Sequence, residues 1–171
     1  MVKKKICLIG GYAVGKTSLV QRYVSGHFSD DYLTTVGVKI DQRMESVDGR
    51  EALLMIWDLA GRDEFQGVEK SYFRGAAAFL YVADGTRRET LEVAREEMSS
   101  IRAQHPDALS ILLLNKHDLK GEWELQEEDL AALRTAGTPF FFTSAKTGEN
   151  VQNVFREIAT RLLDSENSET G

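Results

Sequence analysis

The sequence predicts an α/β fold: a mostly parallel six-stranded sheet with one antiparallel edge hairpin and about five flanking helices. Two observations lead to this fold class. Short apolar runs rich in branched residues alternate with stretches of helical period along the whole chain, as they do in repeated strand–helix units. In addition, the pair Asp48-Gly49 separates two strand-like runs, and an Asp-Gly pair in that setting is a strong signal for a β-hairpin.

The first half of the chain supplies a strand, a helix and the hairpin. The apolar run 6–9 predicts the first strand, and a helix is expected to begin over residues 16–23, directly after a glycine-rich loop. The segment 27–36 is polar and lacks a period, so we expect a mobile loop there. Strands at 38–47 and 52–58 flank the Asp-Gly turn and are expected to form the antiparallel edge of the sheet.

The second half repeats the strand–helix unit. Apolar runs without alternation, typical of strands covered on both faces, occur at residues 77–83, 110–114 and 139–142. Helical periods occur at residues 88–104, 127–136 and 151–163. The end of the chain is acidic and rich in small side chains, so we expect one domain over residues 1–163 and a flexible tail over 164–171.

Composition narrows the class of protein. The 171 residues are 42% hydrophobic and 28% charged, which is typical of a globular chain that can bury a core without disulfides. The single cysteine excludes an intrachain disulfide, and it favours a reducing cytoplasm. A net charge of −6 argues against a broad nucleic-acid surface but leaves room for a local phosphate site.

The sequence offers no signal for membrane attachment. No apolar run approaches the length that a membrane helix needs. Valine at position 2 excludes N-myristoylation, and the last residues contain no cysteine that could be prenylated. We therefore expect a cytoplasmic monomer without membrane insertion and without a lipidation site in this chain.

Residues 10–17, Gly-Gly-Tyr-Ala-Val-Gly-Lys-Thr, match the phosphate-binding pattern G-x-x-x-x-G-K-[ST] between a predicted strand and a predicted helix. Gly10 and Gly15 allow the backbone N–H groups to surround an anion. Lys16 supplies a charge for the β- and γ-phosphates, and the Thr17 hydroxyl is a hard oxygen ligand suited to Mg²⁺. This pattern predicts a P-loop NTPase fold, which ATPases, kinases and GTPases share.

Residues 115–118, Asn-Lys-His-Asp, point to the base of the nucleotide. They directly follow the predicted strand 110–114, and ligands of open α/β sheets bind outside the carboxyl ends of the strands. One carboxylate at Asp118 can accept both the N1–H and the N2–H₂ of guanine, whereas adenine offers no matching pair of donors. This residue favours guanine nucleotides and argues against an ATP-using kinase.

With these motifs the chain resembles the small GTPases of the Ras superfamily, and in particular the Rab branch. The resemblance covers about residues 4–163, and its motifs occur in the family's order at residues 10–17, 35–37, 57–61, 115–118 and 144–146, with Rab-like detail at 35–38, 57–58 and 71–76. It implies a GTP- and GDP-binding switch that uses Mg²⁺. It also implies that effector, exchange-factor and activating proteins bind through residues 29–40 and 61–75.

The resemblance assigns roles to individual residues. It places the metal ligands at Thr17, Thr35 and Asp58, and the catalytic positions at Lys16, Thr35 and Arg62. It places the nucleotide-binding positions at Gly10, Tyr12, Ala13, Val14, Gly15, Lys16, Thr17, Ser18, Phe28, Thr35, Gly61, Asn115, Lys116, Asp118, Ser144, Ala145 and Lys146. The ring of Phe28 would lie against the guanine, although packing on the first helix is an alternative.

Two positions depart from the family pattern. Arg62 stands where the family has a glutamine that orients the attacking water, and arginine has no hydrogen-bond acceptor. Tyr12 stands where the family has a small residue, so its ring would obstruct an arginine arriving from a partner. We predict slow hydrolysis. Two alternatives stay open: Arg62 acts as an arginine finger within the chain, or the protein is a constitutively GTP-loaded binding module that does not hydrolyse GTP.

Two further residues have a structural interpretation. Trp123 lies in an acidic segment, where it would either anchor a partner on the surface or pack beneath the following helix. Cys7 lies within a predicted strand and is expected to behave as a small buried hydrophobe.

Overall fold

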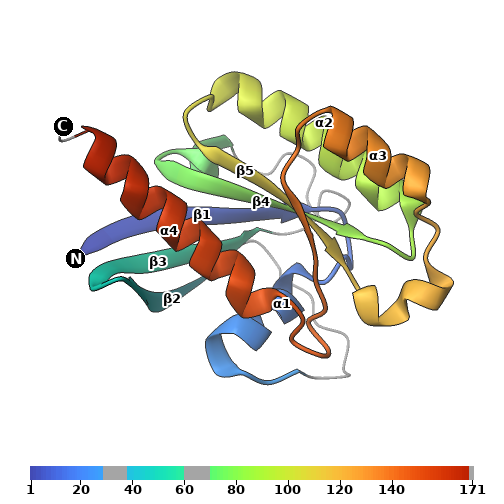
Figure 1. Cartoon of the computed structure of the whole chain (residues 1–171), viewed down its shortest axis with the longest axis horizontal. Helices are drawn as coiled ribbons and strands as arrows, with labels where there is room; N and C mark the ends of the chain where they lie inside the picture. Colours follow the sequence, from blue (N-terminus) through green and yellow to red (C-terminus); the bar gives the residue numbers. More distant parts are fainter. Residues whose placement is uncertain (29–37, 60–69, 170–171) are drawn as a thin grey trace.

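The computed structural model describes residues 1–28, 38–59 and 70–169. Its centre is a six-stranded sheet in the order β2-β3-β1-β4-β5-β6 (Figure 1). The strands are β1 (Val2–Gly10), β2 (Val38–Val47), β3 (Arg50–Leu59), β4 (Ala76–Asp84), β5 (Leu109–Asn115) and β6 (Phe140–Phe142). Among these strands, β2 and β3 pair in the antiparallel direction and the other neighbours are parallel. The predicted fold class is therefore confirmed.

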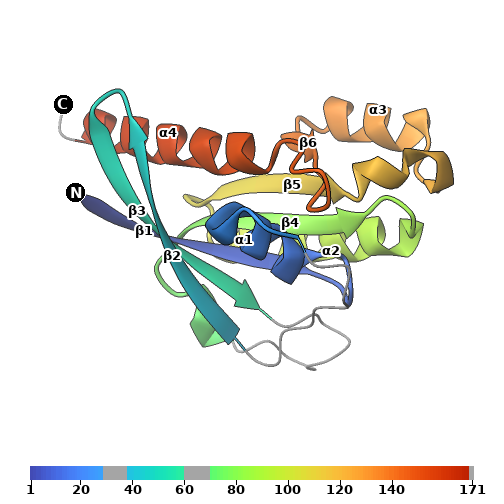
Figure 2. The same ribbon diagram turned by 90° about the horizontal axis from the view of Figure 1, so that it is seen from below.

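Helices cover both faces of the sheet. The described residues contain α1 (Lys16–Ser25), α2 (Arg88–Gln104), α3 (Glu127–Thr135) and α4 (Val151–Glu169), together with short 3₁₀ helices at Lys70–Phe73 and His117–Glu122. Side chains of α1 and α4 belong to one hydrophobic core cluster, and those of α2 and α3 belong to the other. Figure 2 shows the sheet seen from its edge, with α4 running above β1 and β3.

The first strand shows why the apolar runs lack alternation. Ile6 and Leu8 point into the core beneath α1 and α4, whereas Cys7 and Ile9 point into the core beneath α2 and α3. Successive side chains of a strand face opposite sides of the sheet, and here both sides are covered. The part of the strand that is covered on both faces, residues 6–9, is therefore apolar at every position.

The hairpin forms where the Asp-Gly pair predicted it. Asp48 and Gly49 have φ angles of 51° and 78°, the left-handed conformation that a two-residue turn of this kind requires. The pairing runs without interruption from Val47 opposite Arg50 to Val38 opposite Leu59. This register leaves β2 as one edge of the sheet.

The structure differs from the expected tail at the C-terminal end. Residues 164–169 continue α4, which ends at Glu169. Two ion pairs tie this turn of helix to the sheet: Asp164 with Arg50, at 3.0 Å, and Glu166 with Lys4. Acidic side chains that suggested a solvated tail thus find basic partners on β1 and β3. Most of the expected loop at 27–36 lies outside the described residues.

Candidate functional site

The glycine-rich loop between β1 and α1 follows a path that its residue types make possible. Ala13 and Gly15 have φ angles of 58° and 103°, in the left-handed region that favours glycine. A Cβ atom at Gly15 would collide with the side-chain amide of Asn115, and one at Gly10 would lie 2.5 Å from the carbonyl oxygen of Val82 on β4. Glycine is required at position 10 because β4 passes so close, a reason separate from phosphate binding.

The cationic and hydroxyl side chains at the start of α1 lie inside this loop. Lys16 is only 6% exposed, and its Nζ donates to the carbonyl oxygens of Gly10 and Gly11 at 3.1 Å each. The Thr17 hydroxyl donates to Oδ2 of Asp58 at 2.6 Å, and Asp58 is fully buried near the end of β3. A hydroxyl beside a carboxylate is the oxygen-rich chemistry that Mg²⁺ prefers, so the residues present fit a phosphate-bound magnesium ion.

Two residues at the end of β5 hold the glycine-rich loop through hydrogen bonds to its backbone. Asn115 is buried and donates from Nδ2 to the carbonyl oxygen of Val14 at 2.9 Å. Lys116 donates from Nζ to the carbonyl oxygen of Ala13 at 3.2 Å, and pairs with Asp84 at 2.7 Å. These two side chains hold the loop through two of its backbone carbonyl groups.

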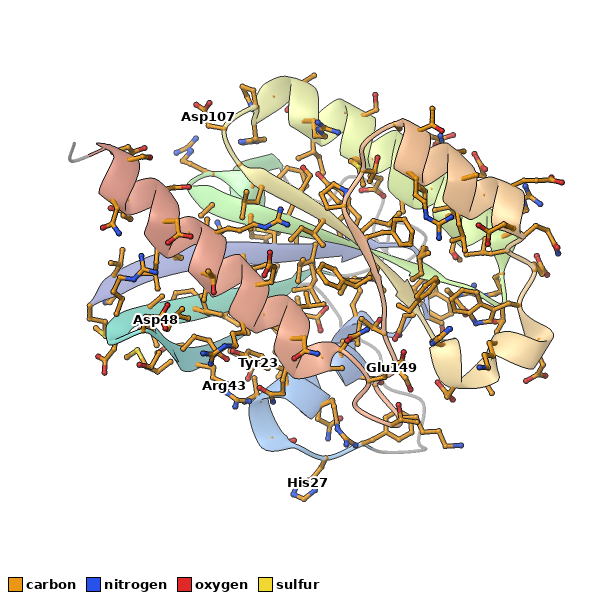
Figure 3. All side chains as sticks on the ribbon, viewed as in Figure 1. Tyr23, His27, Arg43, Asp48, Asp107 and Glu149 are labelled. Atoms are coloured by element: carbon orange, nitrogen blue, oxygen red, sulfur yellow. The ribbon has the colours of Figure 1, made fainter. Side chains whose placement is uncertain are left out.

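The predicted base-reading residues lie together with the last of the five motifs. Oδ1 of Asp118 accepts a hydrogen bond from the Ser144 hydroxyl at 2.8 Å, while Asp118 itself is exposed. Nδ1 of His117 lies 2.9 and 3.0 Å from the two carboxylate oxygens of Glu149, which Figure 3 labels on the loop before α4. The carboxylate of Asp118 is thus oriented by one side chain and open to solvent on its other side.

Two further residues support the site: Arg22, which sequence reasoning missed, and Trp123, whose role the sequence left open between two alternatives. Arg22 of α1 donates to the carbonyl oxygens of Lys146 and Thr147 at 3.2 and 3.3 Å. Trp123 donates from Nε1 to the carbonyl oxygen of Lys116 at 2.8 Å, and its ring packs so closely on Gly85 that no Cβ would fit there. Arg22 thus connects α1 to the loop after β6, more than 120 residues away in the sequence. Trp123 connects the loop after β5 to Gly85 at the end of β4. Trp123 is half-buried against this loop instead of fully presented to a partner.

The remaining predicted residues divide into two groups. Tyr12 is 39% exposed, and Phe28 is half-buried against the core cluster that contains α1 and α4. Ser18 lies on α1, and Ala145 and Lys146 lie on the loop after β6. Thr35, Gly61 and Arg62 lie outside the described residues, so their predicted roles stay predictions.

Two other kinds of site do not occur within the described ranges. Across residues 1–28, 38–59 and 70–169, no three or more His, Cys, Asp or Glu side chains gather in a way that would hold a metal ion. Over the same residues, none of the helices combines the length and the apolar character needed to cross a bilayer.

Comparisons with known proteins agree with this geometry. Residues 5–164 match the model of the Ras family. The chain is 35% identical over 161 residues to the Ras-related protein Rab-13 of Canis lupus familiaris, in a match that covers 93% of this chain and 79% of the relative. It is 34% identical, with the same coverage, to the Ras-related protein Rab-13 of Bos taurus. The chain therefore belongs to the Ras family, as a Rab-like small GTPase that binds GTP and GDP with Mg²⁺.

Proposed function

We propose that the nucleotide of this GTPase switch binds at the carboxyl ends of β1, β3 and β5, within the loops at residues 10–18, 115–118 and 144–146. One observation carries this assignment: the buried ammonium of Lys16 lies inside the loop at 3.1 Å from two of its carbonyl oxygens. Burying a cation is costly unless polar or charged partners surround it, and phosphate is the ligand for which such a loop is suited.

Individual residues of the chain would hold the two cofactors. Thr17 and Asp58, together with Thr35, would hold Mg²⁺, which neutralises charge on the phosphates when it is bound. The carboxylate of Asp118 would accept the guanine donors, with Ala145 and Lys146 beside the base. Hydrolysis would then depend on positioning and on charge stabilisation, without a protein nucleophile.

Slow hydrolysis is the feature that separates this chain from glutamine-bearing relatives. Tyr12 supports it, because its side chain is 39% exposed at the glycine-rich loop, where an approaching partner would meet the ring. Arg62, in place of the glutamine, is the second proposed cause of slow hydrolysis. Single-turnover GTP hydrolysis by the wild-type protein and by Arg62→Gln tests its effect. A faster variant indicates that Arg62 impairs hydrolysis, and a slower variant indicates that Arg62 acts as an arginine finger.

The identity of the nucleotide in purified protein tests the alternative function. Tyr12 and Arg62 are the residues that favour a constitutively GTP-loaded binding module. Stoichiometric GDP in the purified protein would support a cycling switch. Stoichiometric GTP, combined with no measurable phosphate release, would support the module.

The surface for effectors and regulators extends, in this proposal, from residues 29–40 and 61–75 onto the hairpin. Ile40 on the edge strand β2 is 47% exposed and lies directly opposite Trp57 of β3. The ring of Tyr72 lies 6.2 Å from that of Trp57. A partner that binds only the GTP-loaded form should lose its affinity for Ile40→Asp, whereas Met44→Gln, farther along the same strand, should bind normally.

Location and assembly state belong to the same proposal. We propose a cytoplasmic monomer because the chain is acidic and its only cysteine, Cys7, is buried in the sheet. Sedimentation at micromolar concentration should give a single species near 19.2 kDa. A dimer in that experiment would contradict the proposed assembly state.

A further inference from the structure

Arg87, at the start of α2, reaches across to the glycine-rich loop. Its Nη2 donates to the carbonyl oxygen of Tyr12 at 2.6 Å, although 75 residues separate the two. Its Nε donates to Oδ2 of Asp84 at 3.1 Å. The guanidinium therefore forms a bridge between the end of β4 and the nucleotide loop. None of the sequence motifs included this residue.

Asp84 is the anchor of this bridge. Its side chain is 1% exposed, and Oδ2 also accepts a bond from Nζ of Lys116 at 2.7 Å. Oδ1 accepts the backbone N–H and the hydroxyl of Thr86 at 2.9 and 2.7 Å. Burial opposes ionisation, but the hydrogen bonds from Lys116 and Thr86 outweigh it and hold the pKa of the Asp84 carboxyl below its ordinary value. The carboxylate stays charged and holds both cations.

The bridge completes a pattern in the loop. Three consecutive carbonyl groups, those of Tyr12, Ala13 and Val14, accept bonds from Arg87, Lys116 and Asn115 respectively. The strands that position the donors, β4 and β5, are neighbours in the sheet, and β4 lies beside β1 (Figure 1). Each carbonyl is thus held by a donor that comes from outside the loop.

These bonds also determine where the N–H groups of the loop point. A trans peptide unit is planar, so its carbonyl and the N–H of the following residue point in opposite directions. When Arg87 holds the carbonyl of Tyr12 on the outside, the N–H of Ala13 is turned to the opposite side of the same peptide plane. Backbone N–H groups of this kind are the donors that cradle phosphates in such loops.

We propose that Arg87 is a positioning residue that slows nucleotide release by holding the Tyr12 carbonyl and thereby fixing the phosphate-facing N–H of the next residue. The proposal rests on the nucleotide site assigned above. The bridge runs from Asp84 to the Tyr12 carbonyl, and neither end belongs to the predicted ligands of the base or of Mg²⁺. Its loss should therefore accelerate release of GDP without changing the preference for guanine and without requiring loss of magnesium.

Release of tritiated GDP, chased with excess unlabelled GDP, tests this role in three variants. Arg87→Met removes the guanidinium and keeps most of the stem, and Arg87→Lys keeps the charge but cannot bridge two acceptors in the same way. Arg88→Met is the matched control, since the adjacent Arg88 pairs with Asp129 on α3. We expect release about five- to tenfold faster for Arg87→Met, an intermediate rate for Arg87→Lys, and a change below about twofold for Arg88→Met.

Two further measurements separate positioning from general damage. The ratio of the GDP release rates of Arg87→Met and wild type should persist in EDTA, because the bridge does not involve the metal ligands. The association rate of GDP should change less than its release rate. A release rate for Arg87→Met equal to that of Arg88→Met overturns the proposal, and so does lower loading without faster release. The GDP content of the wild-type protein, measured first, tests the site assignment separately.

Discussion

Asn115 donates a hydrogen bond from Nδ2 to the carbonyl oxygen of Val14 at 2.9 Å, across 101 residues of sequence. Its other amide atom, Oδ1, accepts the hydroxyl of Thr143 at 3.1 Å. One buried carboxamide therefore connects the glycine-rich loop, the end of β5 and the residue that follows β6. Both of its polar atoms are used, so no other side chain of similar size would serve equally well.

Replacing Asn115 by alanine should weaken GDP binding and the fold together. The change leaves the buried hydroxyl of Thr143 and the Val14 carbonyl without this partner, which costs about 1–3 kcal/mol for an unsatisfied buried group. We expect GDP affinity to fall about 10- to 100-fold, measured by isothermal titration. Thr143→Val is the control: it removes only one of the two bonds and should cost less. An Asn115→Ala protein with unchanged affinity would contradict the bracing role.

Asp118→Asn should change which base the site accepts. A side-chain amide presents one acceptor and one donor, which matches the N1–H and the 2-oxo group of xanthine and opposes the 2-amino group of guanine. Competition between GDP and XDP should therefore shift toward XDP by at least about 100-fold, because a site that pairs with one set of base donors and acceptors rejects a base that leaves them unpaired. Equal preference before and after the substitution would show that Asp118 does not read the base.

Tyr23→Phe should destabilise the protein without affecting the nucleotide site. The Tyr23 hydroxyl donates to the carboxylate of Glu45, its ring stacks on Phe155 with centroids 4.0 Å apart, and the Arg43 guanidinium lies 4.4 Å above the ring (Figure 3). Loss of the hydroxyl leaves the buried Glu45 without that donor. We expect the free energy of unfolding in urea to fall by about 1–2 kcal/mol. Glu45→Gln, which keeps an acceptor, should cost less.

Alkaline pH should destabilise the protein partly through Cys7. Burial raises the pKa of the Cys7 thiol from 9.0 to about 12, with Lys5 acting in the opposite direction. Between these values the folded state keeps the proton and the unfolded state loses it, so stability falls as pH rises through this window, by up to about 1.4 kcal/mol per pH unit for one group. Unfolding of Cys7→Ala, compared with wild type at pH 8 and pH 10, should show a smaller loss. Equal losses would contradict the shift.

The parts of the fold that the sequence predicted are those governed by local rules. Alternation between strand and helix periods, the Asp-Gly turn and the G-x-x-x-x-G-K-[ST] pattern each depend on neighbouring residues. Asp118 was singled out because its carboxylate matches the donors of guanine, and Asn115 because it directly follows a predicted strand. The interpretation of Gly10 was incomplete, because the close carbonyl oxygen of Val82 belongs to another strand.

The features that were missed depend on long-range contacts. Nothing near Arg87 or Arg22 indicates that their guanidinium groups reach backbone carbonyls 75 and 124 residues away. Residues 164–169 were expected to be a tail because their own composition is acidic, whereas Arg50 and Lys4 provide the partners. Pairings of this kind follow from the sheet order, which local patterns do not specify.

The position of Trp123 gives the protein a built-in optical reporter. The indole N–H of Trp123 is bonded to the carbonyl oxygen of Lys116, beside the predicted base-reading loop, and the only other tryptophan is Trp57 on β3. In a Trp57→Phe protein the intrinsic emission would come from Trp123 alone. Its intensity and wavelength would then follow the polarity around this loop, so arrival of an unlabelled base could be recorded in real time by stopped flow.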